Sequence, residues 1–102
     1  MKSYFDQQIQ RCQEEKAAMM QDGREDEAVF AQIRGNVFGI FKTIWDLDRG
    51  EDFFLQKLQA IPAQWRIFYE TAKLHNDVAA MTVEQIKLDT ARQIQQALEE
   101  HA

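Results

Sequence analysis

The chain has few of the residues that interrupt or cross-link a polypeptide. Its 102 residues include one proline, four glycines and one cysteine. A single cysteine excludes an intrachain disulfide and favours a reducing compartment, where thiols remain free. With so little proline and glycine, few positions are suited to end a regular element. We therefore expect a fold that is held by its core and not by a disulfide.

Long apolar runs and an excess of positive charge are missing as well. No stretch approaches the roughly 18 apolar residues of a membrane-spanning helix, and the first residues, Met1 to Gln8, include no apolar signal region. Lys and Arg number 12 against 17 Asp and Glu, so the net charge of −5 opposes attraction to nucleic-acid phosphates or anionic lipid. We expect a cytoplasmic protein that binds neither nucleic acid nor membrane.

The sequence does have a concentration of aromatic residues in its middle. Nine of its eleven aromatic side chains lie between Phe30 and Tyr69. Apolar residues recur at spacings of three and four, which is typical of helices, and few segments alternate apolar with polar residues as strands do. The predicted fold class is all-α, a compact helical bundle of four main helices plus one short helix, in a single helical domain over residues 1–102.

Two positions decide the predicted helix boundaries. Pro62 predicts a break, because it disfavours the helical conformation for Ile61 and suits the first position of a new helix. Thr82 and Gln85 match a capping box, which predicts the start of the last helix there. Helices are accordingly expected over residues 3–21, 24–49, 52–60, 62–76 and 82–100.

The second of these helices is predicted to be long and central. Its apolar residues cover about half of its circumference, which is more than one antiparallel neighbour covers. The last helix has a narrower apolar stripe, which predicts a single contact at the periphery. The aromatic concentration is therefore read as core material around the second helix.

No set of residues combines into a recognised catalytic, metal or phosphate site. Cys12 lies in the middle of a predicted helix among apolar neighbours, which indicates an inert buried thiol. His75 stands at a predicted helix end, where the helix dipole favours its charged form and capping explains its presence. His101 lies close to the end of the chain. We infer neither catalytic activity nor a cofactor or metal.

Two segments share part of a binding motif and lack the rest. Residues 46–52 begin like a calcium loop, but the fifth, sixth and twelfth positions, which need an oxygen ligand, glycine and glutamate, are Gly50, Glu51 and Lys57. The helices around Pro62 have the spacing of a helix-turn-helix, yet Arg66 and Lys73 are few cations for phosphate contact. We read the first segment as a polar connection and the second as part of the core.

Two features offer surface for a partner. Gly35 and Gly39 lie on one helix face, and each costs about 1 kcal/mol relative to alanine, a cost that close approach of another helix would offset. The alternative is a helix that breaks or kinks near Gly35 and Asn36. Ile67 and Leu74 form a second apolar face, opposite Trp65. The candidate interface residues are therefore Gly35, Gly39, Ile67 and Leu74.

These features favour a protein–protein interaction module, whose partner is a second copy in a homodimer or an unidentified protein. Two alternatives stay open. The aromatic excess, with Met19 and Met20 as adaptable lining, also suits a binding protein for an apolar small molecule in the bundle core. The acidic clusters at residues 22–27 and 46–52 suit an acidic decoy, or inhibitor, of a basic partner surface.

Overall fold

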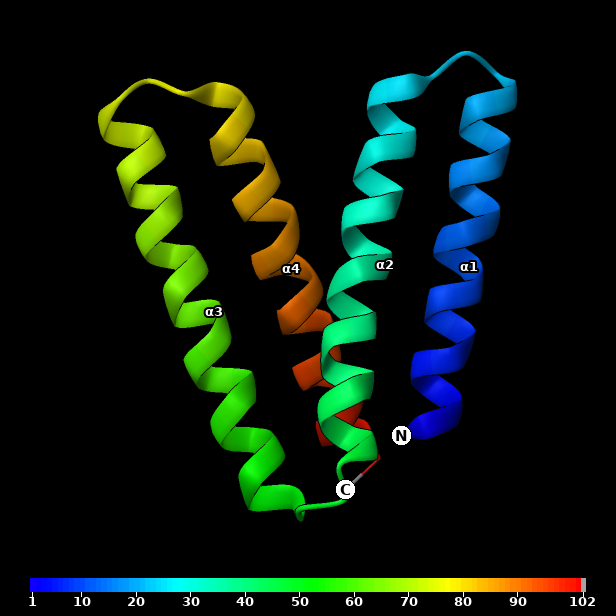
Figure 1. Cartoon of the computed structure of the whole chain (residues 1–102), viewed down its shortest axis with the longest axis vertical. Coiled ribbons are helices and arrows are strands. Elements are labelled where there is room, and N and C mark those ends of the chain that lie inside the picture. Colours follow the sequence, from blue (N-terminus) through cyan, green and yellow to red (C-terminus); the bar gives the residue numbers. More distant parts are fainter. Residues whose placement is uncertain (102) are drawn as a thin grey trace.

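The fold is all-α, as the residue spacing predicts. The computed structural model describes residues 1–101, and all regular structure in that range is helical. The elements are α1 (Lys2–Gln21), α2 (Glu25–Asp46), α3 (Glu51–Leu74) and α4 (Val78–Glu100) (Figure 1). No helix in this range is both long enough and apolar enough to cross a lipid bilayer.

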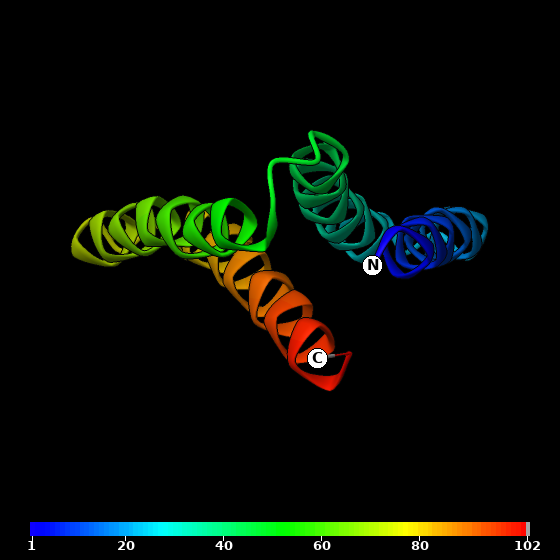
Figure 2. The same cartoon turned by 90° about the horizontal axis from the view of Figure 1, so that it is seen from below.

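The four helices form two antiparallel hairpins, α1–α2 and α3–α4, which are joined at one end. In Figure 1 the hairpins diverge toward the α1–α2 and α3–α4 turns and converge where α2 leads into α3, near the start of α1 and the end of α4. The arrangement is flat, with extents of 39 × 35 × 21 Å. The views from the front and from below both place α1 and α3 at opposite edges, with α2 and α4 between them (Figure 2). Within residues 1–101, one long face of α3 therefore has no helix beside it.

The third helix runs through the proline. α3 is continuous from Glu51 to Leu74, so the expected short helix over 52–60 and the expected helix over 62–76 are one element, and the predicted break is wrong. An interior proline costs about 3 kcal/mol because it cannot donate to the carbonyl four residues earlier, here that of Leu58. Pro62 is buried on the same face of α3 as Leu58 and Trp65. Burial of this face against α4 offsets the local cost.

The second helix is not the long element that was expected. α2 has 22 residues, whereas α3 has 24 and α4 has 23. It ends at Asp46, and the chain then turns at Asp48, whose φ is 54°. Gly50, which comes directly after the expected end of this helix at residue 49, has φ 93° and leads into the first turn of α3. α2 packs against all three other helices.

The last helix starts earlier and lies deeper than expected. The Asp77 side chain accepts a hydrogen bond from the Ala80 amide at 3.1 Å, so α4 begins at Val78 and not at Thr82. α4 packs against α3 and α2. Its expected peripheral position is therefore wrong, because Ala91, Ile94 and Leu98 in its second half belong to the core that all four helices share. The helix with a single long neighbour is α1, which packs along α2.

Aromatic rings fill the place where the two hairpins meet. Phe41 of α2 has no exposed surface and lies edge-on to two rings of α3, with centroid separations of 6.1 Å to Phe54 and 6.3 Å to Trp65. Phe5 of α1 also reaches Phe54, at 6.1 Å. The rest of the buried cluster consists of Cys12, Val37, Phe38, Leu58, Ala91, Ile94 and Leu98. Every helix contributes to this one core.

Phe41→Ala should lower the free energy of unfolding by about 3–5 kcal/mol, because it leaves a cavity at the junction of the hairpins. Urea denaturation followed by circular dichroism measures the change. Phe68→Ala removes the same ring from a position that is 48% exposed, and we expect a loss of about 1 kcal/mol or less. Equal losses at the two positions would show that Phe41 is not central to the core.

Candidate interaction surface

Gly35 packs closely against another helix of the same chain. The helix around it is unbroken, since α2 continues through Gly35 and Asn36. A Cβ atom placed on Gly35 would lie 3.3 Å from the Cβ of Cys12 on α1, whereas one placed on Gly39 would meet no atom within 4 Å. The close approach that a glycine permits at position 35 is therefore made by α1 of the same chain. Gly39 has open space beside it.

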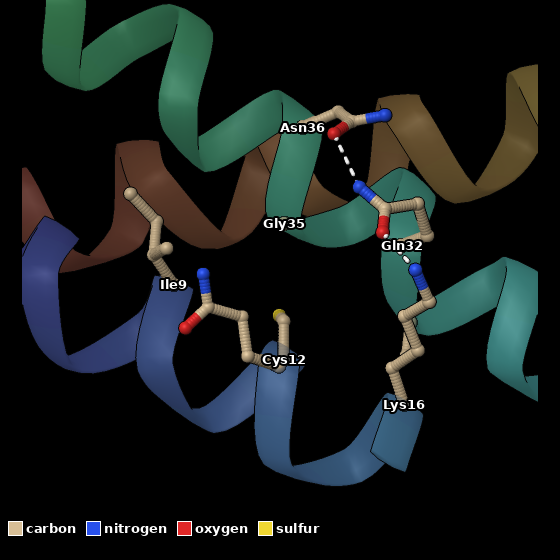
Figure 3. Close-up of a pocket in the computed structure, with 8 residues that line it drawn as sticks. Ile9, Cys12, Lys16, Gln32, Gly35 and Asn36 are labelled. Atoms are coloured by element: carbon tan, nitrogen blue, oxygen red, sulfur yellow. Dashed lines mark hydrogen bonds between the residues drawn. The ribbon is translucent and has the colours of Figure 1, made fainter. Parts of the chain in front are cut away.

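Polar contacts border this glycine contact between α1 and α2. Lys16 donates to Gln32 at 2.7 Å, and the Gln32 amide donates to Asn36 at the same distance (Figure 3). Arg34 pairs with Glu15 at 2.8 Å. The Lys16–Gln32 and Arg34–Glu15 contacts join α1 to α2 beside a hollow of about 140 Å³. This face of α2 is thus largely committed to α1.

A further ion pair joins α1 to α2 nearer the convergent end of the molecule. The Lys42 ammonium lies 2.6 Å from a carboxylate oxygen of Asp6. The hydrogen bond from Lys42 holds the pKa of Asp6 below its ordinary value. Asp6 therefore stays ionised at neutral pH and helps to align the two helices.

Ile67 and Leu74 are placed on the outer face of α3. They are 57% and 82% exposed, and they lie seven residues apart, which is about two helical turns. The face opposite them carries Trp65 and Phe54, which are buried. We use the name α3 stripe for the line of apolar and small residues that shares this outer direction, namely Ala60, Ala63, Ile67, Thr71 and Leu74.

Single exposed apolar side chains are common on protein surfaces, so their arrangement matters more than their number. In the α3 stripe the spacing is three, four, four and three residues, which keeps the members within about 40° of one direction on a helix. Such a seam is typical of a helix that packs along another helix. Among residues 1–101, no other helix packs along this side of α3.

Arg66 and Glu70 flank the α3 stripe on one side. Both side chains are exposed, and neither belongs to the six ion pairs formed within residues 1–101. They also line the mouth of a groove of about 430 Å³ between α3 and α4, whose walls include Tyr69 and Leu88. Sequence analysis noted Arg66 only as a weak phosphate ligand and missed the pair. Its four-residue spacing beside an apolar seam could have revealed it.

No family model, curated protein or solved structure matches the chain.

The other residues that were considered for catalysis, metal binding or partner binding lie at helix ends. His75 ends α3, and its ring N–H can donate to the Thr71 carbonyl at 2.8 Å. Residues 1–101 contain no group of three or more His, Cys, Asp or Glu placed to hold a metal ion. The acidic residues Glu25, Asp26 and Glu27 occupy the first turn of α2. Acidic side chains at that position stabilise the positive end of the helix dipole.

Glu84 is a buried carboxylate that sequence analysis did not single out. Only 9% of its surface is exposed, and one carboxylate oxygen accepts a hydrogen bond from Lys87 at 3.1 Å. The Lys87 ammonium lies 5.7 Å from the centroid of the Trp65 ring. Glu84 lies about two helical turns before the buried Ala91 and so shares the buried face of α4.

Cys12 should react far more slowly with a thiol reagent at neutral pH in the folded protein than in denaturing urea. Burial raises the pKa of its thiol, with Arg34 opposing the shift, so little of the reactive thiolate forms and access is blocked. Absorbance after addition of a chromogenic disulfide measures the rate, and Cys12→Ser is the blank. Equal rates in the two states would contradict the burial of this side chain.

Gly35→Val should destabilise the fold by about 1–3 kcal/mol, because a branched side chain is forced against Cys12 across the helix contact. The same substitution at Gly39 is the matched control. There the added side chain meets open space, and the better helix propensity of valine should make it neutral or slightly stabilising. Urea midpoints of the two variants measure the difference. A Gly35→Val protein as stable as Gly39→Val would refute the close approach.

Proposed function

We propose that this chain is a protein–protein interaction module, that the α3 stripe is its contact surface, and that it self-associates into a homodimer. The observation that supports the proposal is the exposure of Ile67 (57%) and Leu74 (82%) along one face of an edge helix. Removal of such an apolar face from water lowers the free energy and so favours association. A second copy of the chain presents a matching face at the same concentration.

The size of this gain sets the affinity to be expected. Full burial of a leucine or isoleucine side chain is worth about 1.5–3 kcal/mol, so four such side chains in a dimer supply roughly 6–12 kcal/mol before correction for their partial exposure. Association costs about 4–15 kcal/mol in lost translational and rotational freedom. The two terms are similar in size. Only at the low end of this cost, after correction for the 57% and 82% exposure of the two side chains, does a surplus of about 4 kcal/mol remain, so we expect a weak, reversible dimer in the millimolar range.

Leu74→Glu should abolish this association, because it places a charge within a seam that must lose its water. Sedimentation velocity over a concentration series measures the mass. We expect the wild-type mass to rise with concentration above the 12.0 kDa of one chain, and the Leu74→Glu mass to stay constant.

Leu47→Glu is the matched control for this experiment. Leu47 follows α2 and is 56% exposed, so the same change at an exposed leucine away from α3 should leave the association unchanged. A wild-type protein that remains a monomer up to millimolar concentration would refute self-association. A Leu74→Glu protein that associates like the wild type would refute the α3 stripe as its site.

A further inference from the structure

The α3 stripe changes in bulk along its length. Ala60 and Ala63 lie in its first half, Ile67 is at its middle and Leu74 is at its end. Ala60 and Leu74 are each seven residues from Ile67. In a parallel pair of α3 helices, leucine would face leucine at one end and alanine would face alanine across a gap at the other. In an antiparallel pair the leucine of each copy faces the alanine of the other, so that large and small side chains alternate.

The charged flank has the same symmetry. When two identical helices pack antiparallel about a two-fold axis, each flank meets the same flank of the other copy, and residues equally distant from the axis face one another. Arg66 and Glu70 are placed symmetrically about position 68. This centre differs from Ile67 by one residue, about 1.5 Å along the helix, which an arginine side chain readily spans.

A parallel arrangement would leave these charges without partners. Opposite flanks meet in a parallel pair, and the other flank of the α3 stripe has the uncharged residues Gln64 and Phe68 at the level of Arg66 and Glu70. The antiparallel arrangement instead brings Arg66 of each copy beside Glu70 of the other. Both side chains are available for it, because neither is engaged in an ion pair within residues 1–101.

We infer that the dimer is isologous and that α3 packs antiparallel to α3 of the second copy, with the two-fold axis near Ile67 and two reciprocal Arg66–Glu70 ion pairs beside the apolar seam. This inference rests on the proposed self-association and specifies its geometry. The apolar seam supplies the attraction, and the charge pairs select the antiparallel orientation.

Charge reversal tests this geometry. In Arg66→Glu each copy presents two glutamates on the flank, and in Glu70→Arg each presents two arginines, so both homodimers contain two like-charge pairs. We expect each single variant to dimerise about tenfold more weakly than the wild type, or weaker still, at low ionic strength. An equimolar mixture of the two variants restores two opposite-charge pairs and should form a heterodimer with wild-type affinity. The double variant Arg66→Glu/Glu70→Arg should form a homodimer equally well.

Sedimentation equilibrium measures the homodimers, and native mass spectrometry with one variant labelled by ¹⁵N identifies the heterodimer. Arg11→Glu on α1 is the control, since its side chain is exposed on the opposite edge helix and its reversal should leave the affinity unchanged. Recovery in the mixture also shows that both single variants are folded.

The outcomes separate this inference from the proposed function. If the wild type associates but the single reversals do not weaken it, or the mixture does not recover, the antiparallel α3 pair is refuted and self-association stands. A wild type that remains monomeric in the same series refutes both. Weakening by each reversal with recovery in the mixture supports the antiparallel pair, because a parallel pair or a contact elsewhere on the surface would show no such rescue.

Discussion

The edge-on contact of Phe41 with Phe54 and Trp65 is the interaction on which the rest of the structure depends. Each hairpin has its own long interface, but the relative placement of the two is determined by these rings together with the packing of α2 on α4. Aromatic rings prefer edge-to-face contacts of this kind to face-to-face stacking. The rings thereby hold the hairpins side by side, in a flat arrangement that leaves α1 and α3 as edge helices.

Local sequence signals predict a break in α3 that the structure does not have. Pro62 and Ile61 favour a break, and no local rule outweighs them. The helix continues because Leu58, Pro62 and Trp65 share a face that is buried, and that information becomes available only when α4 lies against α3. Thr82 is a comparable case. The side chain of Asp77, about one turn earlier, also caps a helix, and α4 begins there and not at Thr82. The class of the fold, which depends on spacing alone, needs no such knowledge.

The candidate surface could be predicted in part, because helical spacing alone fixes which residues share a face. Ile67 and Leu74 lie opposite Trp65 on any helix that includes all three, so sequence analysis identifies them whether or not α3 breaks. The helix that packs against the glycine pair could not be predicted. A glycine permits the close approach of another helix but does not identify it, and for Gly35 that helix is α1 of the same chain. Ala60 joins the α3 stripe only in a continuous helix. The symmetry of bulk about Ile67 therefore appears only in the structure.

The net charge of −5 places a constraint on any self-association of this chain. Two copies repel at separations up to a Debye length, about 8 Å at physiological salt, so a dimer is favoured only where its seam adds no further repulsion. Many acidic side chains are held at helix starts, as Glu25 and Asp26 are in α2. The flank of the α3 stripe contributes one positive and one negative charge, Arg66 and Glu70. An antiparallel pair places each of these two charges beside the opposite charge of the other copy, so attraction of the apolar seam is opposed only by charges outside the flank.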